Sequence, residues 1–353
     1  MEKKTFLCQI PVSDEGAICL VAHATIEAMS IFIGYISAIE YWRHVERPPG
    51  DRGSRAELRY GHMPSEEQAV EIASAYIRVA GPLHVIVGSK AFYGMRAGIA
   101  CHVHAARIPA RSFYLVAPDL YVLSPEACFV LMATVLTFVQ LVALGDELCG
   151  TYCIDAEADG GMRNRRWAPT SVARIQFYID RATGMHGVDA ARRALKYVVD
   201  GSNSPRETEL EMRLCLPRRV GGYGLVAPLM NHRIDLDEEA ARMAGQDYCL
   251  CDLFWPQANL DLEYDGEQGH AGERKRVKDV GRRFALEHEG VHERTITKLQ
   301  YFQDQTLGYL AGDLVKELGV RFLEPDRQKL YALKDELAEW SRSGTGRKPG
   351  NRS

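Results

Sequence analysis

The segment ANLDLEYDGEQGH, from Ala258 to His270, most constrains the fold, because acidic and apolar residues alternate along it. Successive side chains of a β-strand point to opposite faces of the sheet. An extended strand here has Asp261, Glu263 and Asp265 on one face and apolar residues on the other. Neighbouring carboxylates raise the cost of ionising one another, so this face requires something that offsets their repulsion.

The preceding segment, YCLCDLFW, carries Asp252 as its one charge among apolar and aromatic residues. An ionised carboxylate in such a strand is costly unless it is paired or bound to a metal. Adjacent strands lie about 4.8 Å apart, so Asp252 and Glu263 on neighbouring strands are close enough to share one cation. Carboxylate oxygens suit Mg²⁺ or Mn²⁺. The sequence therefore predicts Mg²⁺ or Mn²⁺ as a cofactor held by this pair.

Other acidic and titratable residues near these strands have ordinary explanations. For Asp261 we expect solvent exposure, because strands with one wet face often carry acids. Glu207 belongs to Ser204-Pro205-Arg206-Glu207, a capping box with proline at the first helical position. His270 follows a turn, where an exposed surface histidine is the common case.

A basic run follows the acidic strand, with six basic residues against one acid, Asp279. Such a run is usually a solvated helix face. Directly after a metal-binding strand, it also predicts a surface that holds a phosphate backbone. The candidate DNA-binding residues are Arg274, Lys275, Arg276, Lys278, Arg282 and Arg283.

The chain of 353 residues is long enough for two domains. Turn residues at Asp200-Gly201-Ser202-Asn203 mark a boundary, so we expect a mixed α/β domain over 1–200, a second domain over 201–320 and a helix with a disordered tail over 321–353. In the second domain we expect strands over 248–255, 260–266 and 292–297, and helices over 204–216, 273–289 and 299–318.

One apolar stretch, Ala127–Gly145, is bracketed by Glu126 and Asp146 and interrupted by threonines, which favours a buried helix over a membrane span. The net charge of -4 gives no general attraction to nucleic acid or membrane, so a polyanion site must be a local patch. The first residues show no apolar leader, which predicts a cytoplasmic protein.

The order SPRETELEMRLCLP, CDLFWPQANLDLEYDGEQGH, a basic helix ending in ALEHEG and a strand with Thr297 resembles the Vsr-like endonuclease domain of the PD-(D/E)xK superfamily. The resemblance covers about Gly201 to Leu318. It implies an α/β (α+β) fold with a restriction-endonuclease-like core, in which helices flank a mixed sheet. It also implies metal-dependent cleavage of DNA phosphodiesters.

The resemblance assigns a role to each matching residue. Asp252 is the central metal ligand, Glu263 is the second acid, and Asp265 stands where the superfamily has its lysine. Glu207 is the acid on the first core helix, and His270 activates water or protonates the leaving oxygen. His270 comes one residue later than in the usual pattern, so a domain that binds DNA without cutting it is the alternative.

The first half is similar to the C-terminal portion of the AbiEi family of type IV toxin–antitoxin antitoxins. The similarity lies in ISAIEYWR, CHVHAARIPARSF and LYVLSPEACFVLMATVLTFVQLVALGDELCG. It implies a regulator that binds DNA or a toxin partner. A helix-containing scaffold without a site of its own is the competing interpretation.

Overall fold

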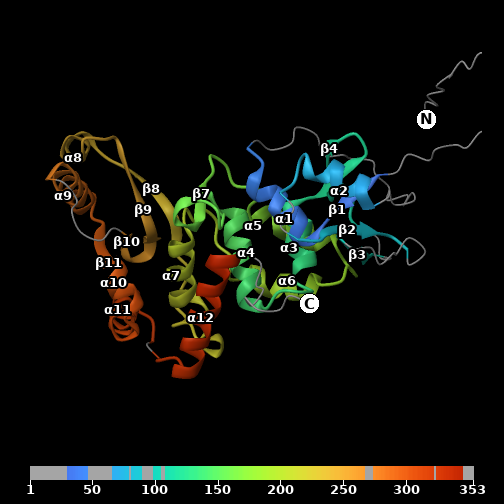
Figure 1. Ribbon diagram of the computed structural model, residues 1–353. Coiled ribbons are helices and arrows are strands. Elements are labelled where there is room, and N and C mark those ends of the chain that lie inside the picture. The colour runs from blue at the N-terminus through green and yellow to red at the C-terminus, as the bar shows by residue number, and fades with distance from the viewer. Residues whose placement is uncertain are drawn as a thin grey trace, which may run out of the picture.

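The computed structural model describes residues 30–46, 66–78, 81–89, 98–104, 108–266, 273–321 and 323–344. Within these ranges, the side chains of residues 66–68, 72 and 273–276 are not described. Three predictions lie outside the described residues: the N-terminal segment, His270, and the tail after residue 344. The two larger sheets lie at opposite ends of the molecule, and helices α4, α7 and α12 lie between them (Figure 1).

The described part of the first half forms a mixed sheet with the strand order β3-β2-β1-β5-β4. The strand β1 pairs antiparallel with β2 and parallel with β5, which makes the sheet mixed as predicted. Its strands are β1 (Ile31–Ile33), β2 (Leu83–Val87), β3 (Ile99–Val103), β4 (Phe113–Ala117) and β5 (Leu120–Leu123). A short ladder joins β6 (Tyr152–Ile154) to β7 (Met162–Asn164).

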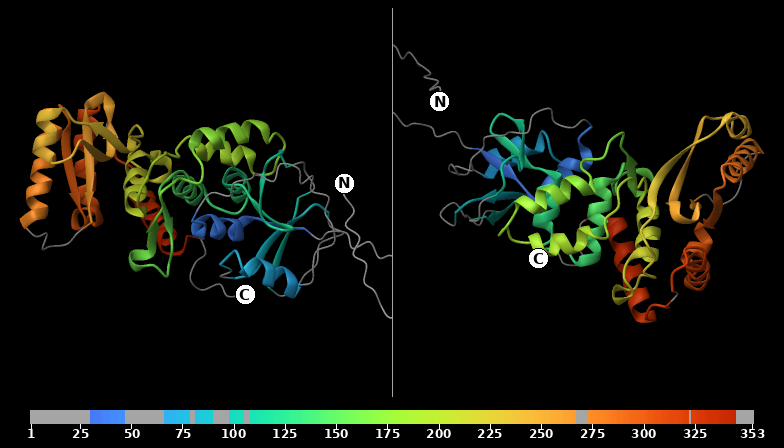
Figure 2. Two further views of the ribbon diagram at one scale, coloured as in Figure 1. Left: turned by 90° about the horizontal axis from the view of Figure 1, so that it is seen from above. Right: turned by 180° about the vertical axis from the view of Figure 1, so that it is seen from behind.

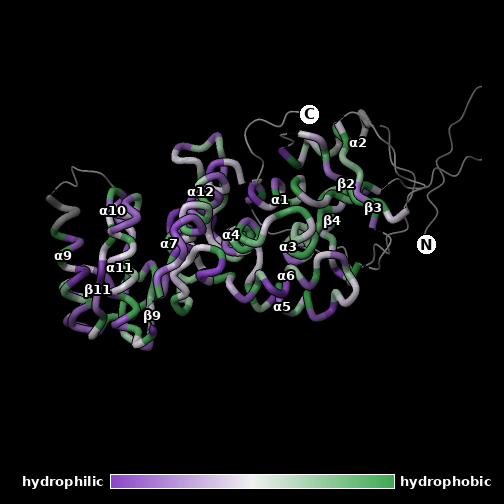
Figure 3. Tube along the Cα trace, turned by 90° about the horizontal axis from the view of Figure 1, so that it is seen from below, coloured by the Kyte–Doolittle hydropathy of each residue, from purple (hydrophilic) through white to green (hydrophobic). Residues whose placement is uncertain are grey.

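Helices of the first half pack around this sheet and around one another. They are α1 (Tyr35–His44), α2 (Glu66–Ser74), α3 (Pro125–Met132), α4 (Phe138–Cys149), α5 (Val172–Arg181) and α6 (Val188–Leu195). Figure 3 shows α3 and α4 as largely hydrophobic tubes at the centre of this half. The main apolar core therefore lies where these two helices meet the other elements.

The apolar stretch from Ala127 to Gly145 is buried as predicted, but it forms two helices instead of one. Thr137 starts α4 with a capping box, because its side chain accepts a hydrogen bond from Gln140 N and the Gln140 side chain accepts one from Thr137 N. This capping box begins α4, after the turn that follows the end of α3 at Met132. In the described part of the chain, no helix has the length and apolarity required to cross a membrane.

The second half contains a mixed sheet with the strand order β11-β10-β9-β8. Its strands are β8 (Leu229–Asp235), β9 (Tyr248–Trp255), β10 (Leu260–Asp265) and β11 (His292–Thr297). The β8–β9 and β9–β10 pairs are antiparallel, and the β10–β11 pair is parallel. The predictions for β9, β10 and β11 are confirmed, whereas β8 was not predicted.

Helices cover both faces of this second sheet (Figure 2), so the predicted α/β class is confirmed. On one face, Leu253 and Leu262 pack with Leu210 of α7 and Leu307 of α11. On the other face, residues of β9 pack with α8 and α9. The helices are α7 (Pro205–Cys215), α8 (Glu238–Ala244), α9 (Glu273–His288), α10 (Lys298–Phe302) and α11 (Asp304–Glu317). The expected helix over 299–318 is thus two helices, parted at Gln303.

The last helix, α12 (Arg327–Ser343), returns to the first half and packs against α4 and α7. Its buried residues Leu333, Leu337 and Trp340 belong to the core of the first half. Met212 of α7 lies in this same core, whereas Leu210 lies in the core of the second sheet. Helix α7 therefore serves both halves, and the boundary predicted at residue 200 falls directly before it.

Candidate acidic site

The predicted acids come together from three elements of the second half. Glu207 lies in the first turn of α7, Asp252 lies in β9, and Glu263 lies in β10, the neighbouring strand. The β9–β10 ladder pairs Leu253 with Leu262, and the acids follow at the next positions along both strands. The sheet therefore places Asp252 and Glu263 side by side, as the sequence predicts.

Each of the two strand acids accepts a hydrogen bond from the backbone of the other strand. The backbone N–H of Asp252 donates to Glu263 Oε1 at 3.3 Å. The backbone N–H of Tyr264 donates to Asp252 Oδ2 at 2.9 Å. These carboxylates satisfy strand N–H groups at the point where the regular ladder ends, and this fixes their positions.

At Asp252, the alternation of side chains along β9 between the two faces of the sheet is interrupted. Cys249 and Cys251 pack in the cluster with α9, whereas Leu253 and Trp255 pack in the cluster with α7. Alternate residues of a regular strand share one face, so the pleat is broken between the two pairs. This irregularity gives Asp252 a half-buried position between the two clusters.

Glu207 is buried, and its carboxylate accepts three hydrogen bonds. The donors are Asn203 N at 2.9 Å, Ser204 Oγ at 2.9 Å and Asn231 Nδ2 at 2.6 Å. Ser204 Oγ also accepts a hydrogen bond from Glu207 N at 3.1 Å, which confirms Ser204 as the cap of α7. Helix capping thus explains the hydrogen bond of the Glu207 backbone N–H. The Glu207 carboxylate makes a further contact, with Asn231 of β8.

The three acids interact electrostatically. Burial, together with the charges of Glu263 and Glu207, raises the pKa of Asp252 to about 8. Burial also raises the pKa of Glu207, and Glu263 adds to that shift. Acids whose pKa values rise through burial and through one another are typical of functional sites.

The expectation that Asp261 is exposed is wrong, because its side chain is fully buried. Helices α8 and α9 cover this face of the sheet, so β10 has no wet face at this position. Burial, together with the charge of Glu263 and a hydrogen bond with it, raises the pKa of Asp261 to about 10, although the nearby Arg282 opposes the shift. This environment favours the protonated form of Asp261 far more than water does.

Arg282 of α9 points inward, although the sequence placed it among the DNA-binding residues. Its guanidinium donates to Glu293 Oε2 at 2.5 Å and to the backbone oxygen of Leu250 at 2.6 Å. It also forms ion pairs with Glu263 and, at 3.5 Å, with Asp261. A positive charge from the protein itself therefore offsets the acids of β10.

The other predicted site residues have different surroundings. Asp265 is exposed at the end of β10, and Lys278 is exposed on α9. Arg283 is half-exposed, and its Nε donates to Glu293 Oε1 at 3.2 Å. Arg274, Lys275 and Arg276 lie in α9, but their side chains are outside the described set.

The donors of this site fit a hard divalent cation in their chemistry, since all are carboxylate oxygens. Asp261 Oδ1 is buried and has no hydrogen-bond partner among the described residues. Among the described residues, however, no three His, Cys, Asp or Glu side chains stand in an arrangement that could hold a metal ion. The carboxylate of Glu263 pairs with Arg282, and that of Glu207 is held by Asn203, Ser204 and Asn231.

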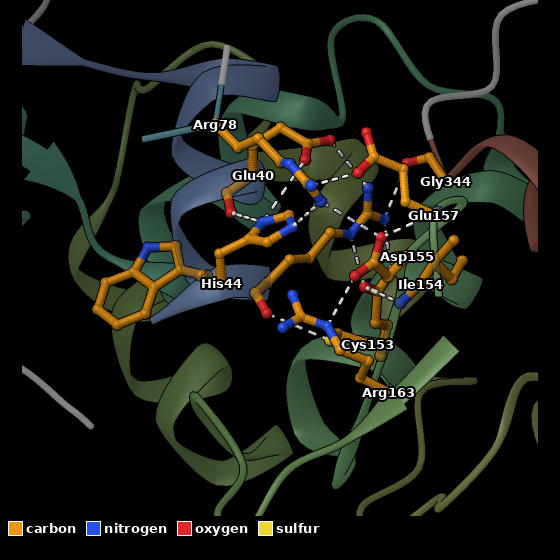
Figure 4. Close-up of polar contacts among 12 residues, drawn as sticks. Glu40, His44, Arg78, Cys153, Ile154, Asp155, Glu157, Arg163 and Gly344 are labelled. Carbon is orange, nitrogen blue, oxygen red and sulfur yellow. Dashed lines mark hydrogen bonds and ion pairs between the residues drawn. The ribbon is translucent and has the colours of Figure 1, made fainter. Parts of the chain in front are cut away.

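A second polar cluster surrounds Arg43 in the first half (Figure 4). The buried Arg43 donates from Nε and Nη2 to the carboxylate of Glu147, at 2.7 Å each, and from Nη2 to Gly344 O at 2.9 Å. The cluster borders a pocket of about 290 Å³. Arg78 and Arg163 both pair there with Asp155. Arg43 thus joins α1 to α4 and to the residue that follows α12, while Asp155, which follows β6, joins Arg78 to Arg163 of β7. The sequence did not predict this cluster, because its residues are far apart in the chain.

Comparison with known proteins leaves the chain without a family assignment. No family model, no curated protein and no solved structure matches it. Its function is therefore inferred from the geometry and charges of the acidic site.

Proposed function

We propose that the second half is a divalent-metal-dependent endonuclease that acts on DNA phosphodiesters, with Asp252 and Glu263 as metal ligands. One observation carries the proposal: acids from α7, β9 and β10 meet at the break in the β9–β10 ladder. Such a concentration of carboxylates costs folding free energy. A site that binds a cation explains why the chain keeps it.

Bound Mg²⁺ or Mn²⁺ would neutralise charge on the phosphate and make a bound water more acidic. Asp252 and Glu263 supply oxygen atoms from neighbouring strands, and Glu207 supplies negative charge from the helix side. His270, which follows β10 in sequence, remains the candidate for proton transfer to the leaving oxygen.

Contacts to DNA are assigned to the outer side of α9. Lys278 is exposed and Arg283 is half-exposed there, and the basic residues 274–276 belong to the same helix. Arg282 has a different role in the proposal, because its guanidinium is held by carboxylates inside the domain. Phosphate contacts of this kind predict binding that weakens as salt rises.

The test is relaxation of supercoiled plasmid DNA in Mg²⁺ by the full chain. Asp252→Asn and Glu263→Gln are each expected to lower the rate by at least about 100-fold, the usual scale for losing a charge-stabilising group. Asp235→Asn is the matched control, because Asp235 is an exposed acid on β8 of the same sheet. Cleavage that persists without metal, or in both site variants, rejects the proposal.

The second candidate is a non-catalytic regulator that binds DNA or a toxin partner. The Arg282–Glu263 ion pair favours it, because a cation of the protein already compensates this acid. A ligand that binds only the folded state raises the melting temperature. If Mn²⁺ leaves the melting temperature unchanged and Asp252→Asn still binds DNA, the regulator is the better assignment.

A further inference from the structure

Three histidines of the first half lie on one face of its sheet. His102 belongs to β3, and His104 follows β3 with its backbone N–H bonded to Val87 O, so these two residues point to the same side. In the parallel β2–β3 ladder, His84 pairs with Ala100, which shares that side with His102. In the described part of this sheet, β3 is an outer strand. The segment CHVHA therefore brings imidazole rings together at an edge of the sheet.

Two of these rings form a direct hydrogen bond. His84 Nδ1 and His102 Nε2 lie 2.9 Å apart, and the rings are stacked with their centroids 5.0 Å apart. One nitrogen must donate a proton and the other must accept it. A protonated imidazole carries N–H groups at both nitrogens and has no acceptor, so the bond requires at least one neutral ring. The pair therefore accommodates one added proton but not two.

Tyr35 connects the histidines to the start of α1. Its ring stacks on His102 with the centroids 3.8 Å apart, and its hydroxyl lies 3.0 Å from His104 Nε2. The φ of Tyr35 is +50°, which is an outlier for a side chain of this size. Such a backbone persists only where the surrounding structure holds it. The contacts with two histidines therefore hold the first turn of α1 against β3.

Burial and mutual repulsion both disfavour protonation of this cluster. His84 and His104 are buried, and His102 is half-buried. Burial, together with the charges of His84 and His104, lowers the pKa of His102 to about 4. Burial and the charge of His186, between α5 and α6, lower the pKa of His104. The close packing of the rings thus favours their neutral forms.

The other titratable groups near the cluster come from several elements. Cys101 is adjacent to His102 on β3 and points to the opposite face. Charged residues from α1, the end of α2 and the segment after β6 line the pocket of about 290 Å³ that His84 borders, and they are Glu40, Arg43, His44, Arg78, Asp155 and Glu157. Each of the acids among them pairs with an arginine. The carboxylates of this pocket are therefore already compensated.

We propose that Tyr35, His84, His102 and His104 form an acid-sensitive latch that holds the start of α1 on the edge strand β3. At neutral pH the neutral rings keep the latch closed. As the pH falls, a second proton removes the acceptor of the His84–His102 bond and places like charges side by side, so β3 is released. The pocket that His84 borders changes with it. This inference is independent of the proposed function.

The pH range follows from the sign of the shift. The pKa of His102 is lower in the folded chain than its ordinary value of 6.5. The stabilising contribution of the neutral ring is therefore fully present above pH 6.5 and is lost as the pH falls toward 4. A shift of this size corresponds to a change of about 100-fold in the opening equilibrium between pH 7 and pH 4.

The experiment is hydrogen exchange of the full chain, read by mass spectrometry and corrected for the chemical exchange rate at each pH. Exchange reports the local opening of a strand. We expect the protection of the β3 amides to fall by about 100-fold between pH 7 and pH 4, and that of β10 in the second half to fall much less. An equal loss in both strands shows global unfolding and overturns the latch.

His102→Gln tests the cause, because glutamine retains a donor and an acceptor but does not titrate. The fall in protection of β3 should shrink to about 10-fold or less in this variant. His292→Gln is the matched control, because His292 is an exposed histidine on β11, and it should keep the full effect. The same pH dependence in His102→Gln and wild type overturns the proposal.

His84→Gln removes the other ring of the bond and replaces His102→Gln if that variant fails to fold. A measurement on the wild type needs no variant. Titration of the imidazole carbon-bound protons by NMR should show His102 neutral at pH 5.5. An ordinary pKa for His102 overturns the latch.

Discussion

Arg282 of α9 forms an ion pair with Glu263 of β10 inside the second half. The same guanidinium pairs with Glu293 of β11, so one cation joins the helix to two adjacent strands. These carboxylates repel one another without it. The position of α9 on the sheet and the charge balance of the acidic site therefore depend on one side chain.

Arg282→Gln is predicted to lower the free energy of unfolding by about 3 kcal/mol in EDTA, because it leaves buried carboxylates without a partner. Mn²⁺ should restore part of this loss, since a divalent cation supplies the missing charge. Urea unfolding with and without Mn²⁺ measures both effects. Arg242→Gln, an exposed arginine on the neighbouring α8, is the control. Equal stabilisation of wild type and Arg282→Gln by Mn²⁺ would contradict this interpretation.

The raised pKa of Asp261 predicts that the free energy of unfolding falls as pH rises. Its pKa is about 10 in the folded chain, against an ordinary value of about 3.9, so the folded state binds this proton more tightly. The free energy of unfolding therefore decreases as pH rises from about 4 to about 10. The stabilisation that comes from the protonated Asp261 is fully present only below about pH 4. Asp261→Asn mimics the protonated acid and should flatten the profile between pH 5 and pH 9. Asp235→Asn on β8 should leave it unchanged, and the same slope in both variants refutes the assignment.

The sequence predicted two neighbouring strands of the second sheet from clear patterns between turns. In β10, apolar and acidic residues alternate, and β9 is an apolar and aromatic segment with a single charge. The sequence missed β8, whose polar Asn231 interrupts the apolar pattern with a left-handed residue. The sequence also wrongly predicted that Asp261 is exposed. Alternation shows which residues of β10 share a face, but it does not show that α9 covers the face that carries Asp261. The inward orientation of Arg282 could not be predicted for the same reason. Which face of the basic helix α9 points inward depends on how the helix packs on the sheet.

Helix α12 is predicted to stabilise the first half, although it follows the second half in sequence. Trp340→Ala removes a side chain that is 2% exposed in the core of the first half, and such changes cost about 3–5 kcal/mol. Tyr331→Ala on the same helix is the control, since Tyr331 is 51% exposed. Thermal unfolding measures both. A larger effect of Tyr331→Ala would show that α12 packs differently.

The junction between the halves contains two buried acids, Asp146 of α4 and Glu211 of α7. In the part of the chain that the structure describes, one oxygen of each lacks a hydrogen-bond partner. Burial raises the pKa of Glu211 to about 8, and burial with the charge of Glu211 raises that of Asp146. Burial therefore favours the neutral form of both acids, and alkaline pH ionises them at a cost. Because a raised folded pKa stabilises only at low pH, stability at this junction should decline toward pH 9.

Glu211→Gln removes one of these ionisable groups and keeps its shape. Relative to the wild type, the free energy of unfolding of the variant should rise by about 4 kcal/mol between pH 5 and pH 9, because each unit of pKa shift corresponds to about 1.4 kcal/mol. Glu238→Gln, at an exposed position on α8, should show no such difference. Urea unfolding at both pH values decides the matter, and the same difference between Glu211→Gln and wild type at pH 5 and pH 9 would contradict it. Glu211 lies one turn after Glu207 on α7, so one helix carries both an acid of the junction and an acid of the candidate site.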